Sequence, residues 1–143
     1  LPADDGSTYT SDDFLGRRYV IYFYPLDNTP GCTKEACQFS ELDGFRALDI
    51  SVLGVSPDSL QSHAKFRDNH NLSIILLSDA EKTVSAAFGA WGEKSNYGRT
   101  YMGIIRSTFI VGPDGRVERI FQPVRKADGH AAQVLEELRG TSV

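Results

Sequence analysis

The chain has 143 residues, of which 41% are hydrophobic, and its formal net charge is −4. This size and apolar content suit one globular domain over residues 1–143 with a sizeable core. The acidic balance and the lack of a basic tract argue against nucleic acid or an anionic membrane as a partner. No apolar run is long enough to span a membrane and no signal peptide is visible, so we expect a cytoplasmic protein. Because the sequence begins at Leu1, a removed targeting peptide is left open.

The predicted elements alternate along the chain. Residues 1–13 are polar, with a turn at 4–6 and a helical turn at 11–15 that Gly16 closes. Predicted strands cover 19–24, 50–55, 74–77, 107–111 and 117–122; predicted helices cover 59–70, 82–88 and 129–138, and one more begins at 30 and ends near Gly44. Residues 90–103, rich in glycine and aromatic side chains, are expected to form a long loop. The glycines of segment 112–116 favour a hairpin between the last two strands.

The strand at 19–24 is apolar at every position, which predicts a place at the centre of a sheet. Strands and helices then alternate three times before the hairpin and a final helix. This order predicts an α/β fold with a mixed central β-sheet flanked by helices, in which the hairpin supplies the antiparallel part.

The segment after this strand has the features of a reactive thiol. Thr29 suits a helix N-cap, Pro30 suits the first helical position, and Cys32 then lies in the first turn. The free N–H groups and the positive dipole end of a helix favour negative charge there, and the thiolate is the reactive form of cysteine. Cys37 follows five residues later. Two cysteines do not make a disulfide framework, so we expect a redox-active or an inert pair.

Helical spacing places Cys32, Ala36 and Phe39 on one buried face of this helix. We expect Lys34 and Glu35 to belong to its exposed face.

The same segment resembles the peroxiredoxins, in particular those of the bacterioferritin-comigratory-protein or PrxQ type. Pro25, Thr29 and Cys32 match the motif Pro-x-x-x-Thr-x-x-Cys of peroxiredoxins, and Cys37 matches the resolving cysteine that marks this subgroup. Residues 101–111 resemble the segment with the active-site arginine, here Arg106. The resemblance extends over nearly the whole chain, and these motifs together are far more specific than a pair of cysteines.

The resemblance implies a thioredoxin-like fold, in agreement with the α/β pattern, and a thiol peroxidase. Cys32 would attack hydrogen peroxide or an organic hydroperoxide and become a sulfenic acid. Cys37 would condense with it to form a disulfide, and thioredoxin would restore both thiols. The implied enzyme is a monomer and needs no metal, haem or flavin cofactor.

The resemblance also assigns supporting roles. The hydroxyl of Thr29 would orient the peroxide, the guanidinium of Arg106 would hold the thiolate, and Pro25 would shield it from water. The backbone amides of Gly31 and Cys32 would donate to the peroxide as in an oxyanion hole. From the residues alone, simpler roles stay open: Thr29 as an N-cap bonded to the Cys32 amide, Pro25 as a strand end, and Arg106 as a solvated charge.

The two cysteines would also suit two other functions, and the histidines raise the question of a metal site. A thiol–disulfide oxidoreductase acting on proteins would more often carry Cys-x-x-Cys, which is absent here, and a non-catalytic redox sensor could signal through the same disulfide. His63 and His70 share a predicted helix, but the cysteine spacing is wrong for a zinc finger, so we expect no metal. His130 is expected to be exposed at the start of the last helix.

Disulfide formation on an intact helix is excluded by geometry. Five residues at about 1.5 Å rise separate Cys32 and Cys37 by about 7.5 Å along the axis, with side chains about 140° apart around it. Bridged cysteines rarely have Cα atoms more than about 7 Å apart. We therefore predict that both cysteines lie on one helix in the reduced chain and that oxidation unwinds part of it.

Overall fold

The computed structural model describes residues 1–141, apart from the side chains of residues 96 and 141. Its central feature is a five-stranded sheet in the order β3-β2-β1-β6-β7. The strands are β1 (Tyr19–Phe23), β2 (Ser51–Ser56), β3 (Ile75–Ser78), β6 (Ser107–Val111) and β7 (Val117–Phe121). β1 is parallel to β2 and antiparallel to β6, and β2 is parallel to β3. The predicted mixed sheet, with the first strand in its centre, is confirmed.

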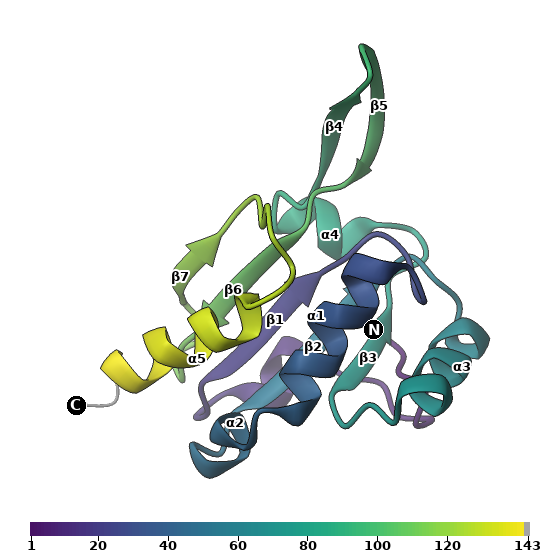
Figure 1. Ribbon diagram of the computed structural model, residues 1–143. Helices are drawn as coiled ribbons and strands as arrows, with labels where there is room; N and C mark the ends of the chain where they lie inside the picture. Colours follow the sequence, from purple (N-terminus) through teal and green to yellow (C-terminus); the bar gives the residue numbers. More distant parts are fainter. Residues whose placement is uncertain (142–143) are drawn as a thin grey trace.

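Helices cover both faces of this sheet (Figure 1). They are the 3-10 turn η1 (Ser11–Phe14), α1 (Pro30–Glu41), α2 (Asp43–Ala47), α3 (Leu60–His70), α4 (Thr83–Ala87) and α5 (His130–Thr141). Side chains of β1 alternate between two apolar clusters: Tyr22 packs with residues of α1, α3 and α5, whereas Phe23 packs with the N-terminal segment and α4. Both faces of β1 are therefore buried, which explains its uniformly apolar sequence.

Residues 90–103 do not form a loop, as we expected, but a hairpin of β4 (Trp91–Asn96) and β5 (Arg99–Ile104) that projects from the body (Figure 1). Tyr97 and Gly98 form its turn with φ angles of 53° and 78°. Left-handed values at both central positions are typical of hairpin turns, although tyrosine is an unusual residue for them. The strands carry few β-branched residues and their side chains are largely exposed, so the sequence lacks the usual strand pattern.

The prediction that the helix beginning at Pro30 ends near Gly44 was wrong. That helix ends at Glu41, and Gly44 lies inside the short helix α2. A Cβ atom added at Gly44 would lie 2.5 Å from Cδ2 of Leu135 in α5. The glycine thus permits close contact between two helices rather than marking an end.

His130 is buried, contrary to the expectation from sequence, with 3% of its surface exposed. Its Nε2 lies 2.7 Å from Oγ1 of Thr108, and its ring packs edge-on against Phe39 and Phe121. The first turn of α5 therefore faces α1 and β7 instead of solvent.

Candidate active site

The loop of residues 25–29 leaves β1 and leads directly into α1. Thr29 is the N-cap and Pro30 the first helical residue, as predicted, and Cys32 is 1% exposed in the first turn. The side chain of Thr29 does not cap the helix, because its Oγ1 donates to the carbonyl oxygen of Leu26 at 2.8 Å. The simpler role left open by the sequence, a side-chain cap bonded to the Cys32 amide, is therefore not found. The lone pairs of the hydroxyl remain available as acceptors.

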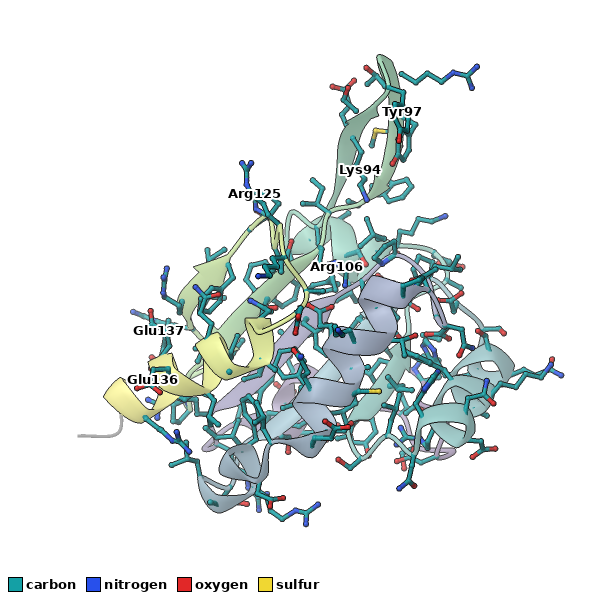
Figure 2. The ribbon with its side chains drawn as sticks, viewed as in Figure 1. Lys94, Tyr97, Arg106, Arg125, Glu136 and Glu137 are labelled. Atoms are coloured by element: carbon teal, nitrogen blue, oxygen red, sulfur yellow. The ribbon has the colours of Figure 1, made fainter. Side chains whose placement is uncertain are left out.

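Arg106 lies between the projecting hairpin and β6, beside the N-terminal end of α1 (Figure 2). Its Nη2 donates to Sγ of Cys32 at 3.1 Å, and its Nη1 donates to Oε1 of Glu35 at 2.6 Å. One planar guanidinium thus contacts a thiol sulfur and a carboxylate at once. Arg106 is not a solvated charge at a strand end, since only 18% of its side chain is exposed.

Glu35 is fully buried, which corrects the expectation that it belongs to an exposed helix face. It lies three residues after Cys32, so a helix puts both side chains on the same side. Burial raises the pKa of Glu35 to about 7, although the nearby Arg106 opposes this shift. Its second oxygen, Oε2, has no hydrogen-bond partner among the described residues, and a proton bound there would not disturb the bond to Arg106. Lys34 is exposed, as expected.

This raised pKa predicts a specific pH dependence of stability. Between the ordinary carboxyl pKa of 4.5 and about 7, the folded protein binds more protons at Glu35 than the unfolded chain does. Stability contributed by this residue therefore falls as the pH rises through that window. In Glu35→Gln this loss is absent. Urea unfolding at about pH 5 and about pH 7 should therefore show that the wild type loses about 2 kcal/mol of stability relative to the variant. The exposed Glu41→Gln on the same helix is the control, and identical pH profiles for wild type and Glu35→Gln would contradict the assignment.

Gly31 and Pro25 also lie at this site. A Cβ atom added at Gly31 would lie 3.4 Å from Nη2 of Arg106, so the backbone passes directly beside the guanidinium. The first-turn amides of Gly31 and Cys32 lack acceptors within the helix, as at any helix start. Pro25 lines a groove of about 590 Å³ together with Arg106. The rest of its lining comes from the hairpin and from the segments on either side of β6 and β7, namely Glu93, Lys94, Ser95, Ile105, Gln122, Pro123 and Val124.

Cys37 lies on α1 with Cys32, and both thiols are free, which confirms the prediction for the reduced chain. Cys37 is half-buried next to a second groove. Burial, with a smaller contribution from the Glu41 carboxylate, raises the pKa of the Cys37 thiol above its ordinary value. Cys37 is therefore protonated at neutral pH, which disfavours it as the first nucleophile.

The histidines are occupied by other contacts. Both ring nitrogens of His63 have partners, and Nε2 of His70 lies 3.2 Å from Oδ1 of Asn28. Within residues 1–141, no group of three His, Cys, Asp or Glu side chains is arranged to hold a metal ion. None of the described helices is long and apolar enough to cross a bilayer.

Comparison with known proteins identifies the family. A family model described as AhpC/TSA matches residues 1–120. The chain belongs to the AhpC/TSA family. Peroxiredoxin Bcp of Bacillus subtilis (strain 168) is 44% identical over 143 residues, covering 99% of this chain and 90% of its own. A putative peroxiredoxin bcp of Helicobacter pylori (strain J99) is 48% identical over 139 residues, covering 96% of this chain and 91% of its own.

A solved structure agrees with this family membership. The bacterioferritin comigratory protein of Xanthomonas campestris, studied for its reduction of alkyl peroxides, superposes with a TM-score of 0.94 at 38% identity. The match covers 100% of this chain and 91% of that chain. The chain is thus a Bcp/PrxQ-type peroxiredoxin with a thioredoxin-like fold, and it is a thiol peroxidase. The resemblance inferred from the sequence motifs is confirmed.

Proposed function

We propose that Cys32 is the peroxidatic cysteine of this enzyme. The observation that supports this choice best is the 3.1 Å contact between Nη2 of Arg106 and Sγ of Cys32 at the N-terminus of α1. A guanidinium can only donate, so the sulfur is the acceptor, as a thiolate would be. Helix dipole and guanidinium together stabilise negative charge on this sulfur.

The thiolate of Cys32 attacks the terminal oxygen of the peroxide along the O–O axis. The S–O bond forms as the O–O bond breaks, leaving a sulfenic acid on Cys32 and an alcohol or water once the departing oxygen takes a proton. Arg106 and the first-turn amides of Gly31 and Cys32 stabilise the developing negative charge. Thr29 accepts a hydrogen bond from the peroxide through its hydroxyl oxygen.

Arg106→Ala should slow the reaction with peroxide by about 10²-fold or more, as loss of a preorganised donor at developing charge does. Stopped-flow mixing of the reduced protein with peroxide measures this rate. Arg106→Lys keeps the charge without the two-pronged contact and should restore the rate only in part.

The exposed Arg99 of β5 supplies the matched control for this experiment. Arg99→Ala removes the same type of side chain at a position that does not contact the sulfur, and it should leave the rate unchanged. A wild-type rate in Arg106→Ala would remove this residue from the site.

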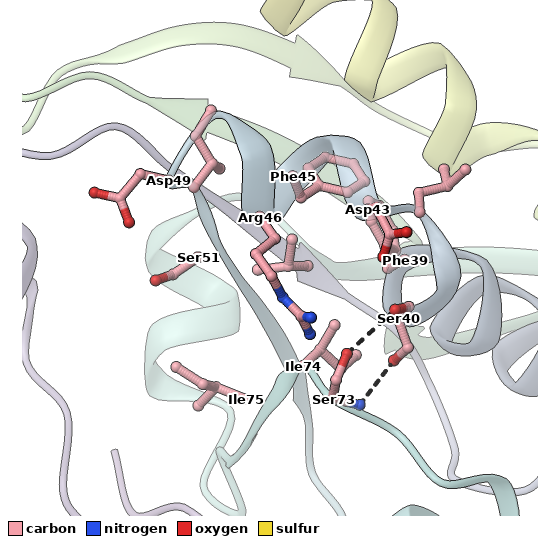
Figure 3. A pocket seen from close by; sticks show the side chains of 13 residues that line it. Phe39, Ser40, Asp43, Phe45, Arg46, Asp49, Ser51, Ser73, Ile74 and Ile75 are labelled. Carbon is pink, nitrogen blue, oxygen red and sulfur yellow. Dashed lines mark hydrogen bonds between the residues drawn. The ribbon is translucent and has the colours of Figure 1, made fainter.

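We further propose that Cys37 resolves the sulfenic acid. Its sulfur attacks the oxidised sulfur of Cys32, the S–OH bond breaks, and a disulfide and water result. Since both cysteines lie on α1, part of that helix must unwind first. The C-terminal end of α1 is held by two exposed, neutral hydrogen bonds between Ser40 and Ser73, beside a hollow of about 230 Å³ (Figure 3). Such contacts cost little to break.

Hydrogen exchange tests the unwinding. Amides of residues 31–39 should exchange faster in the oxidised protein than in the reduced protein, because their helical hydrogen bonds open. Amides of β1, buried at the centre of the sheet, are the internal control and should keep their protection in both states. Equal protection of residues 31–39 in the two redox states would contradict this step.

The remaining assignments concern substrates and partners. The groove beside Pro25 and Arg106, with apolar side chains of Ile105, Pro123 and Val124, has room for the organic part of a hydroperoxide. We propose that both hydrogen peroxide and organic hydroperoxides are reduced, that thioredoxin is the reductant, and that the protein acts as a monomer. Peroxide turnover with thioredoxin, thioredoxin reductase and NADPH tests the reductant, and light scattering tests the monomer.

A further inference from the structure

A buried ion pair joins the loop of residues 25–29 to α3, and the proposed chemistry does not use it. Nδ1 of His63 in α3 lies 2.7 Å from Oδ2 of Asp27 in this loop. Asp27 is 7% exposed and His63 is fully buried. Buried charges are costly unless they are paired and hydrogen-bonded, so a pair placed here needs an explanation.

The partners of His63 fix its protonation state. Nδ1 faces the carboxylate of Asp27, and Nε2 lies 2.8 Å from the carbonyl oxygen of Leu77 in β3. Both partners can only accept, so both ring nitrogens carry protons and the ring is an imidazolium. Burial lowers the pKa of His63, but the hydrogen bond and charge of Asp27 outweigh burial and leave it raised. The other titratable groups that face the pair are Tyr24, directly after β1, and Asp58, after β2.

Asp27 is held from several sides. Tyr24 donates to its Oδ1 at 2.6 Å, and Ser62 donates to its Oδ2 at 2.8 Å. Its backbone N–H donates to Oδ2 of Asp58 at 2.8 Å. The loop is thereby tied through one residue to the position directly after β1, to α3 and to the segment after β2.

Asp27 stands between the residues that shape the peroxide site. Leu26, the preceding residue, supplies the carbonyl that accepts the hydroxyl of Thr29. Asn28, the following residue, has a left-handed φ of 62°, a conformation that needs support from its surroundings. Asp27 is therefore connected to the Thr29 hydroxyl through its chain neighbours, so its position bears on where that hydroxyl lies.

We propose that Asp27 and His63 are positioning residues for the peroxidase reaction. Their ion pair fixes the loop so that Pro25 and Thr29 stand in the reactive arrangement over Cys32. This role rests on the proposed function of Cys32, and neither residue touches the reacting atoms.

Two rates measured on the same protein separate positioning from thiol reactivity. Peroxide needs the arranged loop, whereas iodoacetamide needs only the thiolate. In Asp27→Asn the reaction of reduced protein with hydrogen peroxide should slow by about 10²-fold, the effect of a misplacement near 1 Å. Alkylation of Cys32, followed by mass spectrometry, should stay within about a factor of three of wild type. His63→Gln should show the same separation of rates.

Asp4→Asn is the matched control. It makes the same substitution in an ion pair with Arg67 of α3, at 2.6 Å, that ties the N-terminal segment rather than the loop to this helix. Both rates should remain at wild-type values. If Asp4→Asn slowed the reaction with peroxide as much as Asp27→Asn does, the positioning role would be overturned.

Nitrogen NMR of His63 gives a readout independent of activity. Both ring nitrogens should be protonated in wild type at pH 7, above the ordinary histidine pKa of about 6.5, and only one in Asp27→Asn. A singly protonated His63 ring in the wild type would overturn the proposal. A wild-type peroxide rate in Asp27→Asn or His63→Gln would also overturn it. So would an equal loss of the peroxide rate and the alkylation rate in both variants. If wild-type Cys32 is alkylated but does not reduce peroxide, the proposed function of Cys32 fails, and the positioning role falls with it even where NMR shows the ion pair.

Discussion

Replacing Cys32 with serine should abolish peroxide reduction, with a loss of about 10⁴-fold or more. An alcohol is hardly ionised at neutral pH and cannot replace a thiolate as nucleophile. The contact with Arg106 and the position in the first turn would be kept, because serine differs from cysteine by one atom. Loss of activity in a folded variant would thus report chemistry rather than structure.

Peroxide consumption by the reduced variant measures this effect, with circular dichroism to verify the fold. Cys37→Ser is the matched control, since it makes the same substitution on the same helix and should keep the first reaction with peroxide. Appreciable peroxide consumption by Cys32→Ser would rule out Cys32 as the nucleophile.

Cys37→Ser should lose thioredoxin-dependent recycling down to background. No second thiol is then present to condense with the sulfenic acid, since the sequence has only two cysteines. The sulfenic acid on Cys32 should persist and pass to the sulfinic acid with excess peroxide. Mass spectrometry after sulfenic-acid trapping detects both species. Normal steady-state recycling by thioredoxin in this variant would show that Cys37 is not the resolving cysteine.

Much of the fold could be predicted because its signals are local. The apolar run at 19–24 and the regular alternation of strands and helices identified a mixed sheet with its central strand. The hairpin of β4 and β5 could not be predicted in this way. It packs little apolar surface, so its sequence lacks the alternation that identifies half-buried strands.

The site was predictable only in part, because only some of its residues are marked by local sequence signals. The cap and first-turn signals identified Thr29 and Cys32, but Arg106 was found only through the resemblance to a family. Glu35 was missed because its partner Arg106 is 71 residues away, and helical spacing alone does not reveal a distant cation. The pair of Asp27 and His63, 36 residues apart, was missed likewise.

Functions other than a peroxidase predict different behaviour of the same two thiols. A reductase of protein disulfides would reduce insulin-like substrates without consuming peroxide. A non-catalytic sensor would react once with peroxide and would not turn over with a dithiol reductant. Family membership and the contact between Arg106 and Cys32 favour the peroxidase.

The most direct test of this account is a single-turnover experiment on the reduced wild-type protein. One equivalent of hydrogen peroxide is added, and thiol titration with peptide mapping then identifies the products. We expect two thiols to disappear for each peroxide consumed, and Cys32 and Cys37 of one chain to be found in a disulfide. Peroxide left unconsumed, or consumed while Cys32 remains a free thiol, would contradict it.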